Sequence, residues 1–95
     1  MADLRIRLYV SGDTTISRKA RENLMRLCEG FPSNGVTAQV IDVTAEPGAA
    51  EEARILATPT LVYEHPIRPK RIIGDLSDMK RVLEFLGIEE YGESK

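Results

Sequence analysis

Few side chains in this sequence could do chemistry, and its sulfur and imidazole groups stand alone. The chain has one cysteine, Cys28, which rules out an internal disulfide and any CxxC redox or zinc site. It has one histidine, His65, with no cysteine or acidic cluster beside it, whereas a protein metal site needs several ligands. We therefore expect buried packing for Cys28 and a loop position for His65, with no metal and no cofactor.

The remaining candidates are oxygen-bearing side chains near the ends of apolar runs. Asp42 closes one such run, and Asp75 and Ser77 lie between another run and a helical stretch. A catalytic carboxylate needs a partner and a pocket, and neither is evident. Capping or salt bridging is the simpler role for these side chains, so we expect no catalytic residue and no enzyme.

A proline marks the most specific local feature. Thr58-Pro59 leads directly into a short β run. A cis X–Pro bond is a minority conformer that folds retain for tight backbone geometry. We therefore predict a fixed bend with a cis bond at Pro59, beside a potential site.

Hydrophobic periodicity predicts the elements of the first half. A strand with one buried face is indicated by alternation in Leu4, Ile6, Leu8 and Val10. A helix follows, with apolar residues at Ile16, Ala20, Leu24, Leu27 and Phe31. Its expected N-cap is Thr15 or Ser17, and Gly30 should end it. A second strand is predicted over Val36 to Val43, where Val40-Ile41 indicates burial on both faces, as in a central strand.

The second half reads as a short helix, a hairpin and a last helix. Pro47 suits the first helical position, and the helix is expected to carry Ala50, Ala53 and Leu56. Two short strands, Thr60 to Tyr63 and Lys70 to Ile73, should form the hairpin. The final apolar stripe consists of Met79, Val82, Leu83 and Leu86, with Gly87 as its stop.

The predicted order is therefore βαβαββα, an α/β thioredoxin-like plan forming a single domain over residues 1–95. A redox thiol in that plan sits at the start of the first helix, where the dipole lowers its pKa. Those positions, Asp13 to Ile16, hold no cysteine. Glutathione-binding domains share the plan, and Thr58, Pro59, Asp75 and Ser77 could imitate their site. Transferases of that class need a second helical domain, which this chain lacks.

Composition narrows the partners. The formal net charge is −2, aromatic residues make up 5%, and tryptophan is absent. Neither a basic surface of the size that nucleic acid needs nor a stacking platform is indicated. There is no apolar run near 18 residues and no signal-peptide pattern, so we expect a soluble cytoplasmic protein with neither membrane nor nucleic-acid partners.

Basic residues gather in one stretch of the predicted first helix. Arg18, Lys19 and Arg21 occupy its first turns, where positive charge opposes the helix dipole. Arg5 and Arg7 share the non-core face of the first strand. Helix stability therefore does not explain the cluster, which is either a binding surface or an ordinary solvated face.

Taken in order, several motifs of the chain resemble the KaiB family of circadian clock proteins. The matching segments are Leu8-Tyr9-Val10-Ser11-Gly12, Val40-Ile41-Asp42-Val43, Pro47 with Ala50-Glu51-Glu52, Ile55-Leu56-Ala57-Thr58-Pro59-Thr60-Leu61, and Arg71-Ile72-Ile73-Gly74-Asp75-Leu76-Ser77-Asp78. They span most of the chain, and their ordered combination is specific.

The resemblance implies a binding protein without catalysis. Members of the family bind the N-terminal ring of the ATPase KaiC and then sequester KaiA. The first helix and the second strand face KaiC, which assigns partner binding to Arg18, Lys19, Thr37 and Gln39. Lys19 matches a basic position of that surface, whereas Gln39 stands where a basic side chain is common. Open alternatives are a KaiB paralogue in stress signalling and a small glutathione- or thiol-binding enzyme.

The resemblance also implies two folds. Family members switch between a tetramer of order βαββααβ and a thioredoxin-like monomer that binds KaiC. Positions assigned to this switch or to local structure are Thr58, Pro59, Pro66, Pro69, Gly74, Asp75, Phe85 and Gly87.

Two departures from the family pattern bear on the switch. The proline spacing differs in His65-Pro66-Ile67-Arg68-Pro69-Lys70. No glycine interrupts Lys80 to Leu86, and an interior glycine costs a helix about 1 kcal/mol relative to alanine. We therefore predict that the thioredoxin-like form dominates.

Overall fold

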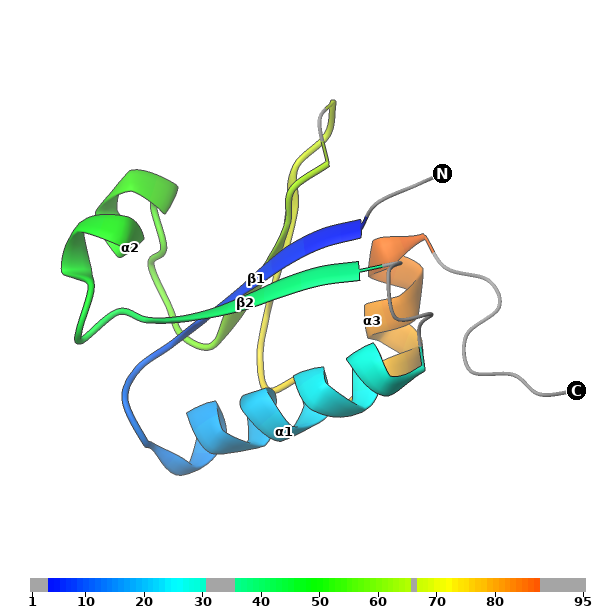
Figure 1. The fold of residues 1–95 in the computed structure, drawn as a ribbon, viewed down its shortest axis with the longest axis horizontal. Coiled ribbons are helices and arrows are strands. Elements are labelled where there is room, and N and C mark those ends of the chain that lie inside the picture. Colours follow the sequence, from blue (N-terminus) through cyan, green and yellow to red (C-terminus); the bar gives the residue numbers. More distant parts are fainter. Residues whose placement is uncertain (1–3, 31–35, 66, 88–95) are drawn as a thin grey trace, which may run out of the picture.

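The computed structural model describes residues 4–30, 36–65 and 67–87. Its elements, in chain order, are β1 (Leu4–Val10), α1 (Thr15–Glu29), β2 (Val36–Asp42), α2 (Pro47–Ala53), β3 (Thr60–Tyr63), β4 (Lys70–Ile73) and α3 (Met79–Leu86) (Figure 1). The predicted order βαβαββα is confirmed.

The four strands form one sheet in the order β2-β1-β3-β4. Strand β1 pairs in parallel with β2 and antiparallel with β3, so that Leu8 lies opposite both Val40 and Leu61. The predicted central position of the second strand is therefore wrong, because β1 occupies the centre and β2 lies at an edge. Val40 is accordingly 46% exposed, and burial is confined to Ile41.

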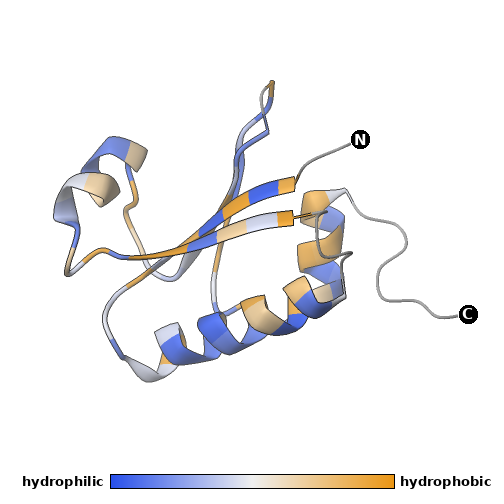
Figure 2. Ribbon diagram, in the orientation of Figure 1, coloured by the Kyte–Doolittle hydropathy of each residue, from blue (hydrophilic) through white to orange (hydrophobic). Residues whose placement is uncertain are grey.

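One face of β1 carries the core. Its alternating apolar residues are buried between the sheet and two helices, and Figure 2 shows this alternation along the strand. The core residues of the described chain are Leu4, Ile6, Leu8, Val10, Ala20, Leu24, Leu27, Leu61, Ile72, Leu76, Val82 and Leu86. Ile16, predicted to join them, is about half exposed at the start of α1, and Phe31 lies outside the described residues.

Helix α2 lies on the opposite face of the sheet, and a strand residue fixes its end. Arg71 alternates along β4 with the core residue Ile72, so its side chain leaves on the other face. The Arg71 Nη1 and Nη2 groups donate to the carbonyls of Arg54 and Ala53, both at 2.9 Å. Because those carbonyls end a helix that buries no residue of its own, Arg71 supplies the C-terminal hydrogen bonds that the helix lacks.

The α2 helix is shorter than predicted. It ends at Ala53, where the next residue, Arg54, adopts a left-handed conformation with φ of 56°. Leu56, expected to belong to this helix, lies beyond its end and is 97% exposed.

Helix caps also differ in part from the sequence prediction. The N-cap of α1 is Thr14, whose Oγ1 accepts from the Ser17 amide at 3.2 Å, in place of Thr15 or Ser17. Helix α3 begins after Asp78, whose Oδ1 accepts from the Arg81 amide, so the expected caps Asp75 and Ser77 are wrong. The helix ends as predicted at Gly87, which has a φ of 75°.

We predict a clear contrast between two apolar residues of α1. Leu27→Ala should lower the free energy of unfolding by about 2–5 kcal/mol, because it opens a cavity in the core. Met25→Ala on the same helix, where Met25 is 64% exposed, should change it by about 0.5 kcal/mol or less. Urea denaturation measures both, and equal losses would contradict this core assignment.

Candidate partner-binding surface

Thr37 and Gln39 lie on the edge strand, with their side chains exposed. They pair with Arg5 and Arg7 of β1, so all four side chains leave on the face opposite the core. Within the described residues, β2 has β1 as its one neighbour. Its outer edge therefore presents unpaired backbone groups, the type of edge to which another chain can bind.

Arg7 is held by two partners beside this edge. Its Nε lies 2.5 Å from Glu64 Oε2. A hydrogen bond with the Tyr9 side chain and the charge of Glu64 raise the pKa of Arg7 above its ordinary value. Arg7 is therefore a positioned group whose charge is partly compensated.

The start of α1 carries a second charged group around Asp13. Arg18 Nη2 lies 3.5 Å from Asp13 Oδ2, and Arg21 Nη1 lies 3.4 Å from Asp13 Oδ1. One carboxylate thus faces two guanidinium groups, and one positive charge is left over. Exposed pairs of this kind contribute little stability, so these arginines are available to a partner.

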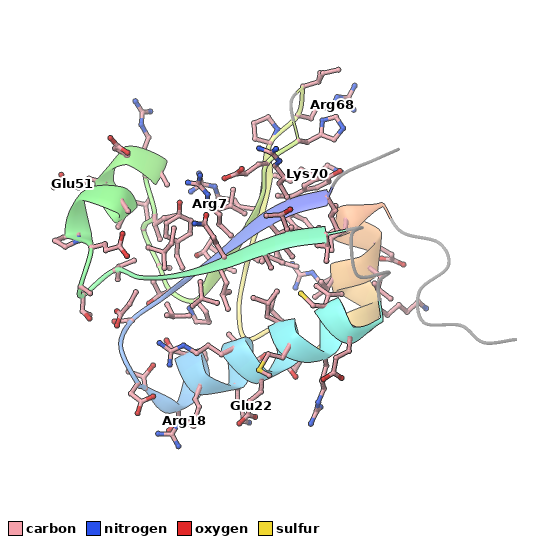
Figure 3. All side chains as sticks on the ribbon, in the orientation of Figure 1. Arg7, Arg18, Glu22, Glu51, Arg68 and Lys70 are labelled. Carbon is pink, nitrogen blue, oxygen red and sulfur yellow. The ribbon has the colours of Figure 1, made fainter. Side chains whose placement is uncertain are left out.

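Lys19 leaves the helix in another direction. The pKa of Asp75 is lowered by hydrogen bonds from Ser77 and, more weakly, by the charge of Lys19. Asn23, four residues after Lys19 on the same helix face, donates from Nδ2 to the Asp75 carbonyl at 2.7 Å. This face of α1 therefore lies beside the connection between β4 and α3, whereas Arg18 lies beside Asp13. The structure brings Thr37 and Gln39 together and sets Arg18 beside Arg21, but it does not unite all four predicted contact residues. Figure 3 shows Arg18 on α1 apart from Arg7 on β1.

Asp42 connects the end of β2 to the loop before α1, whereas the sequence predicted capping or salt bridging for it. Its Oδ1 accepts from the Gly12 amide at 2.9 Å, the Thr44 amide at 3.0 Å and the Thr44 hydroxyl at 2.7 Å. These hydrogen bonds, that of the Thr44 hydroxyl first, lower the pKa of Asp42. Because Gly12 lies in the loop before α1, Asp42 ties the end of β2 to the approach to the helix.

The bend at Pro59 is as predicted. The Thr58-Pro59 bond is cis, and the Pro59 carbonyl accepts from the Gly74 amide at 3.0 Å. Gly74 has a φ of 135°, a conformation that side chains disfavour. This contact joins the bend to the end of β4.

The other positions assigned to the fold switch are distributed over the second half. Phe85 is half-buried against the core, and its ring lies edge-on to Tyr63 with centroids 6.4 Å apart. Pro69 is exposed just before β4, and Asp75 Oδ1 accepts from the Ser77 amide at 3.0 Å. Pro66 lies outside the described residues.

The geometry offers little support for thiol chemistry. Cys28 is half-buried near the end of α1, and burial raises the pKa of its thiol, which disfavours the reactive thiolate. A cavity of about 110 Å³ follows β4 and is lined by residues 72–78 with Arg81 and Val82. Thr58 and Pro59 do not line it, so the four residues that could imitate a glutathione site do not share this cavity.

The described residues contain neither a cluster of metal ligands nor a membrane-spanning helix. No three side chains of the His, Cys, Asp or Glu type gather there as metal ligands would. No helix in the described ranges has both the length and the apolar character for crossing a membrane.

Comparison with known proteins places these features in context. A family model described as the KaiB domain matches residues 7–88. The chain is 44% identical over 88 residues to the circadian clock oscillator protein KaiB of Synechococcus elongatus, covering 93% of this chain and 85% of that protein. It is 38% identical over 87 residues to the circadian clock protein KaiB3 of Synechocystis sp., covering 92% and 85%.

Solved structures show the same fold. The N-terminal domain of Synechococcus elongatus SasA superposes with a TM-score of 0.70 at 24% identity, covering 95% of this chain and 89% of that one. Chloroplastic thioredoxin z superposes with a TM-score of 0.75 at 20% identity, covering 90% and 76%. The thioredoxin-like fold predicted from the sequence is thereby confirmed.

We predict a pH-dependent effect of Asp42→Asn. Because the folded-state pKa of Asp42 lies below its ordinary value of 3.8, its ionised form stabilises the fold above that value, and the contribution is lost as pH falls through the folded-state pKa. Asp42→Asn should therefore lower Tm at pH 7, and the difference from the parent chain should shrink towards pH 3.

Thermal unfolding followed by circular dichroism between pH 7 and pH 3 measures this difference. Glu46→Gln, at an exposed position near the same loop, is the matched control and should leave Tm nearly unchanged. A Tm difference for Asp42→Asn that stays constant with pH would contradict the assigned role.

Proposed function

Because the chain belongs to the KaiB family of circadian clock proteins, we propose that it is a non-enzymatic regulator that docks on a KaiC-type ATPase ring. In this proposal the thioredoxin-like form binds as a monomer, and the resulting complex sequesters KaiA. The observation that carries the proposal is a surface in two halves, which are the free edge of β2 and the exposed arginines at the start of α1, a helix that packs on the other face of the sheet from Thr37 and Gln39.

That surface has the properties of a docking site. Thr37 and Gln39 stand exposed on an edge strand, beside a row of β1 arginines. Asp42 hydrogen bonds hold the end of this strand to the loop that precedes α1. The two halves are therefore fixed relative to each other before a partner arrives, which lowers the ordering cost of binding.

Electrostatic attraction is assigned to the helix half of the surface. Arg18 and Arg21 share one carboxylate, and Lys19 adds a further positive charge on the side facing Asp75. The strand half is weaker in this respect, because Gln39 is neutral. Charges at the rim of an interface act mainly on association rate and salt dependence, so we assign them a steering role.

The second half of the chain supports the thioredoxin-like form as the binding form. Helix α3 has an uninterrupted apolar stripe, and its Val82 and Leu86 are buried in the core. Gly87 ends it with a left-handed cap. Converting this segment to strand would remove both features.

A second candidate is a KaiB paralogue with a role in stress signalling. The neutral Gln39, at a position where a basic side chain is common in the family, favours this alternative. A paralogue of this kind would have the same surface but a different partner. Failure of the folded chain to bind a KaiC-type ring would therefore support this alternative.

We predict that charge reversal on α1 weakens ring binding. Arg18→Glu and Lys19→Glu should each reduce affinity for a KaiC-type ring by about tenfold. In each variant a negative charge replaces a positive one and repels the acidic partner surface that the parent residue would attract. The loss should be smaller at high salt. Biolayer interferometry at low and high salt measures it.

Lys80→Glu provides the control, since Lys80 is exposed on α3 and is not among the residues assigned to the surface. It should bind as the parent chain does. Equal loss for Lys80→Glu and Lys19→Glu would show a general charge effect and overturn the assigned surface.

A further inference from the structure

The turn between β3 and β4 gathers hydrogen-bond donors and positive charge around a cavity. The cavity has a volume of about 380 Å³ and is lined by His65, Ile67, Arg68 and Lys70. Figure 3 shows Arg68 and Lys70 together on this hairpin, apart from Arg18 on α1. Because β3 begins beside Pro59 and ends at Tyr63, the turn lies at the end of the strand farther from the cis bond.

His65 orders this turn. Its Nδ1 accepts from the amides of both Ile67 and Arg68 at 3.1 Å. In the neutral ring, a nitrogen that accepts leaves the proton on the other one, so Nε2 is a donor. The ring also lies edge-on to Tyr63, with centroids 5.4 Å apart. The cavity wall is therefore held in place before any ligand binds.

The charges around the cavity are not neutralised by acids within the described residues. Arg68 has no carboxylate partner there. Lys70 Nζ donates at 3.4 Å to the Phe85 carbonyl, which carries no net charge. The neighbouring acid Glu64 is taken by Arg7 at 2.5 Å. Two cations and an imidazole donor thus line a cavity that has no acidic side chain among its lining residues.

The wall also has an apolar component. Ile67 is 80% exposed at the tip of the turn, beside the two cations. The cavity of about 380 Å³ compares with about 10–15 Å³ that one water needs in the same measure, so a small inorganic anion would fill little of it. A ligand that carries both carboxylates and an apolar side chain matches this wall in charge and in character.

We propose that the β3–β4 turn is a docking site for an acidic segment of a partner protein that carries a large apolar residue. The carboxylates of the segment bind Arg68, Lys70 and the Nε2 group of His65, and its apolar side chain covers Ile67. This site is separate from Arg18 and Lys19, so one partner on α1 and another on the turn can bind independently.

The test uses the peptide acetyl-Glu-Leu-Glu-Glu-Leu-Glu-amide, titrated into the full ¹⁵N-labelled chain at constant ionic strength. The amide signals of Ile67, Arg68 and Lys70 should shift and saturate. Arg68→Gln should weaken peptide binding by about two- to fivefold, the effect of one exposed charge pair. The substitution keeps the backbone amide at position 68, which donates to His65 Nδ1. Ile67→Ser should lower the affinity for the peptide and leave the shifts caused by inorganic phosphate unchanged.

Lys80→Gln is the matched control and should bind the peptide as the parent chain does. Absence of saturation, shifts reproduced by sodium chloride, or equal losses in Arg68→Gln and Lys80→Gln would each overturn the proposal. Inorganic phosphate binding as tightly as the peptide would also overturn it, because the occupant would then be a free oxyanion.

Discussion

The structure depends on the two-sidedness of the central strand. β1 buries Leu4, Ile6, Leu8 and Val10 on one face, and this face anchors α1 and α3. The opposite face carries α2, which buries no residue of its own, the buried pair Tyr9 and Ile41, and polar side chains of β1 and β2. The core on one face of β1 therefore anchors the two longer helices, and the outer part of the edge strand β2 stays open to a partner.

Specific hydrogen bonds place the elements that this core does not hold. Asp42 fixes the end of the edge strand to the loop before α1, and Arg71 fixes the end of α2 to the opposite face of the sheet. His65 does the same within the β3–β4 turn. Each of these groups lies near an exposed surface, so the polar network positions the surfaces and the apolar core supplies the stability.

Local patterns made most helices and strands predictable from the sequence, but they did not show which strands neighbour each other in the sheet. The bounds of β3 and β4 were predicted as two short strands of a hairpin, and the bend at Pro59 was predicted from a single dipeptide. The edge position of β2 could not be read from Val40-Ile41, because strand neighbours are set by the whole topology. Among the caps, Thr14, Thr15 and Ser17 compete within four positions, and propensity does not separate them.

The candidate site was less predictable than the fold. Arg18, Lys19, Thr37 and Gln39 came from a family resemblance, and no local signal shows that Arg18 and Lys19 face different neighbours. The contact of Arg71 with α2 joins residues far apart in sequence and leaves no pattern. The Asp-x-Thr spacing of Asp42 and Thr44 is the one local cue to the loop connection.

The central claim is that the thioredoxin-like form stands ready to bind, and backbone-assigned NMR tests it most directly. The account predicts strand chemical shifts at Lys70–Ile73 and helix shifts at Met79–Leu86 in the free chain, at low and high concentration. The same shifts should persist when a KaiC-type ring is added. Strand shifts over Val82 to Leu86 in the free chain, or a second set of peaks that grows with concentration, would contradict it.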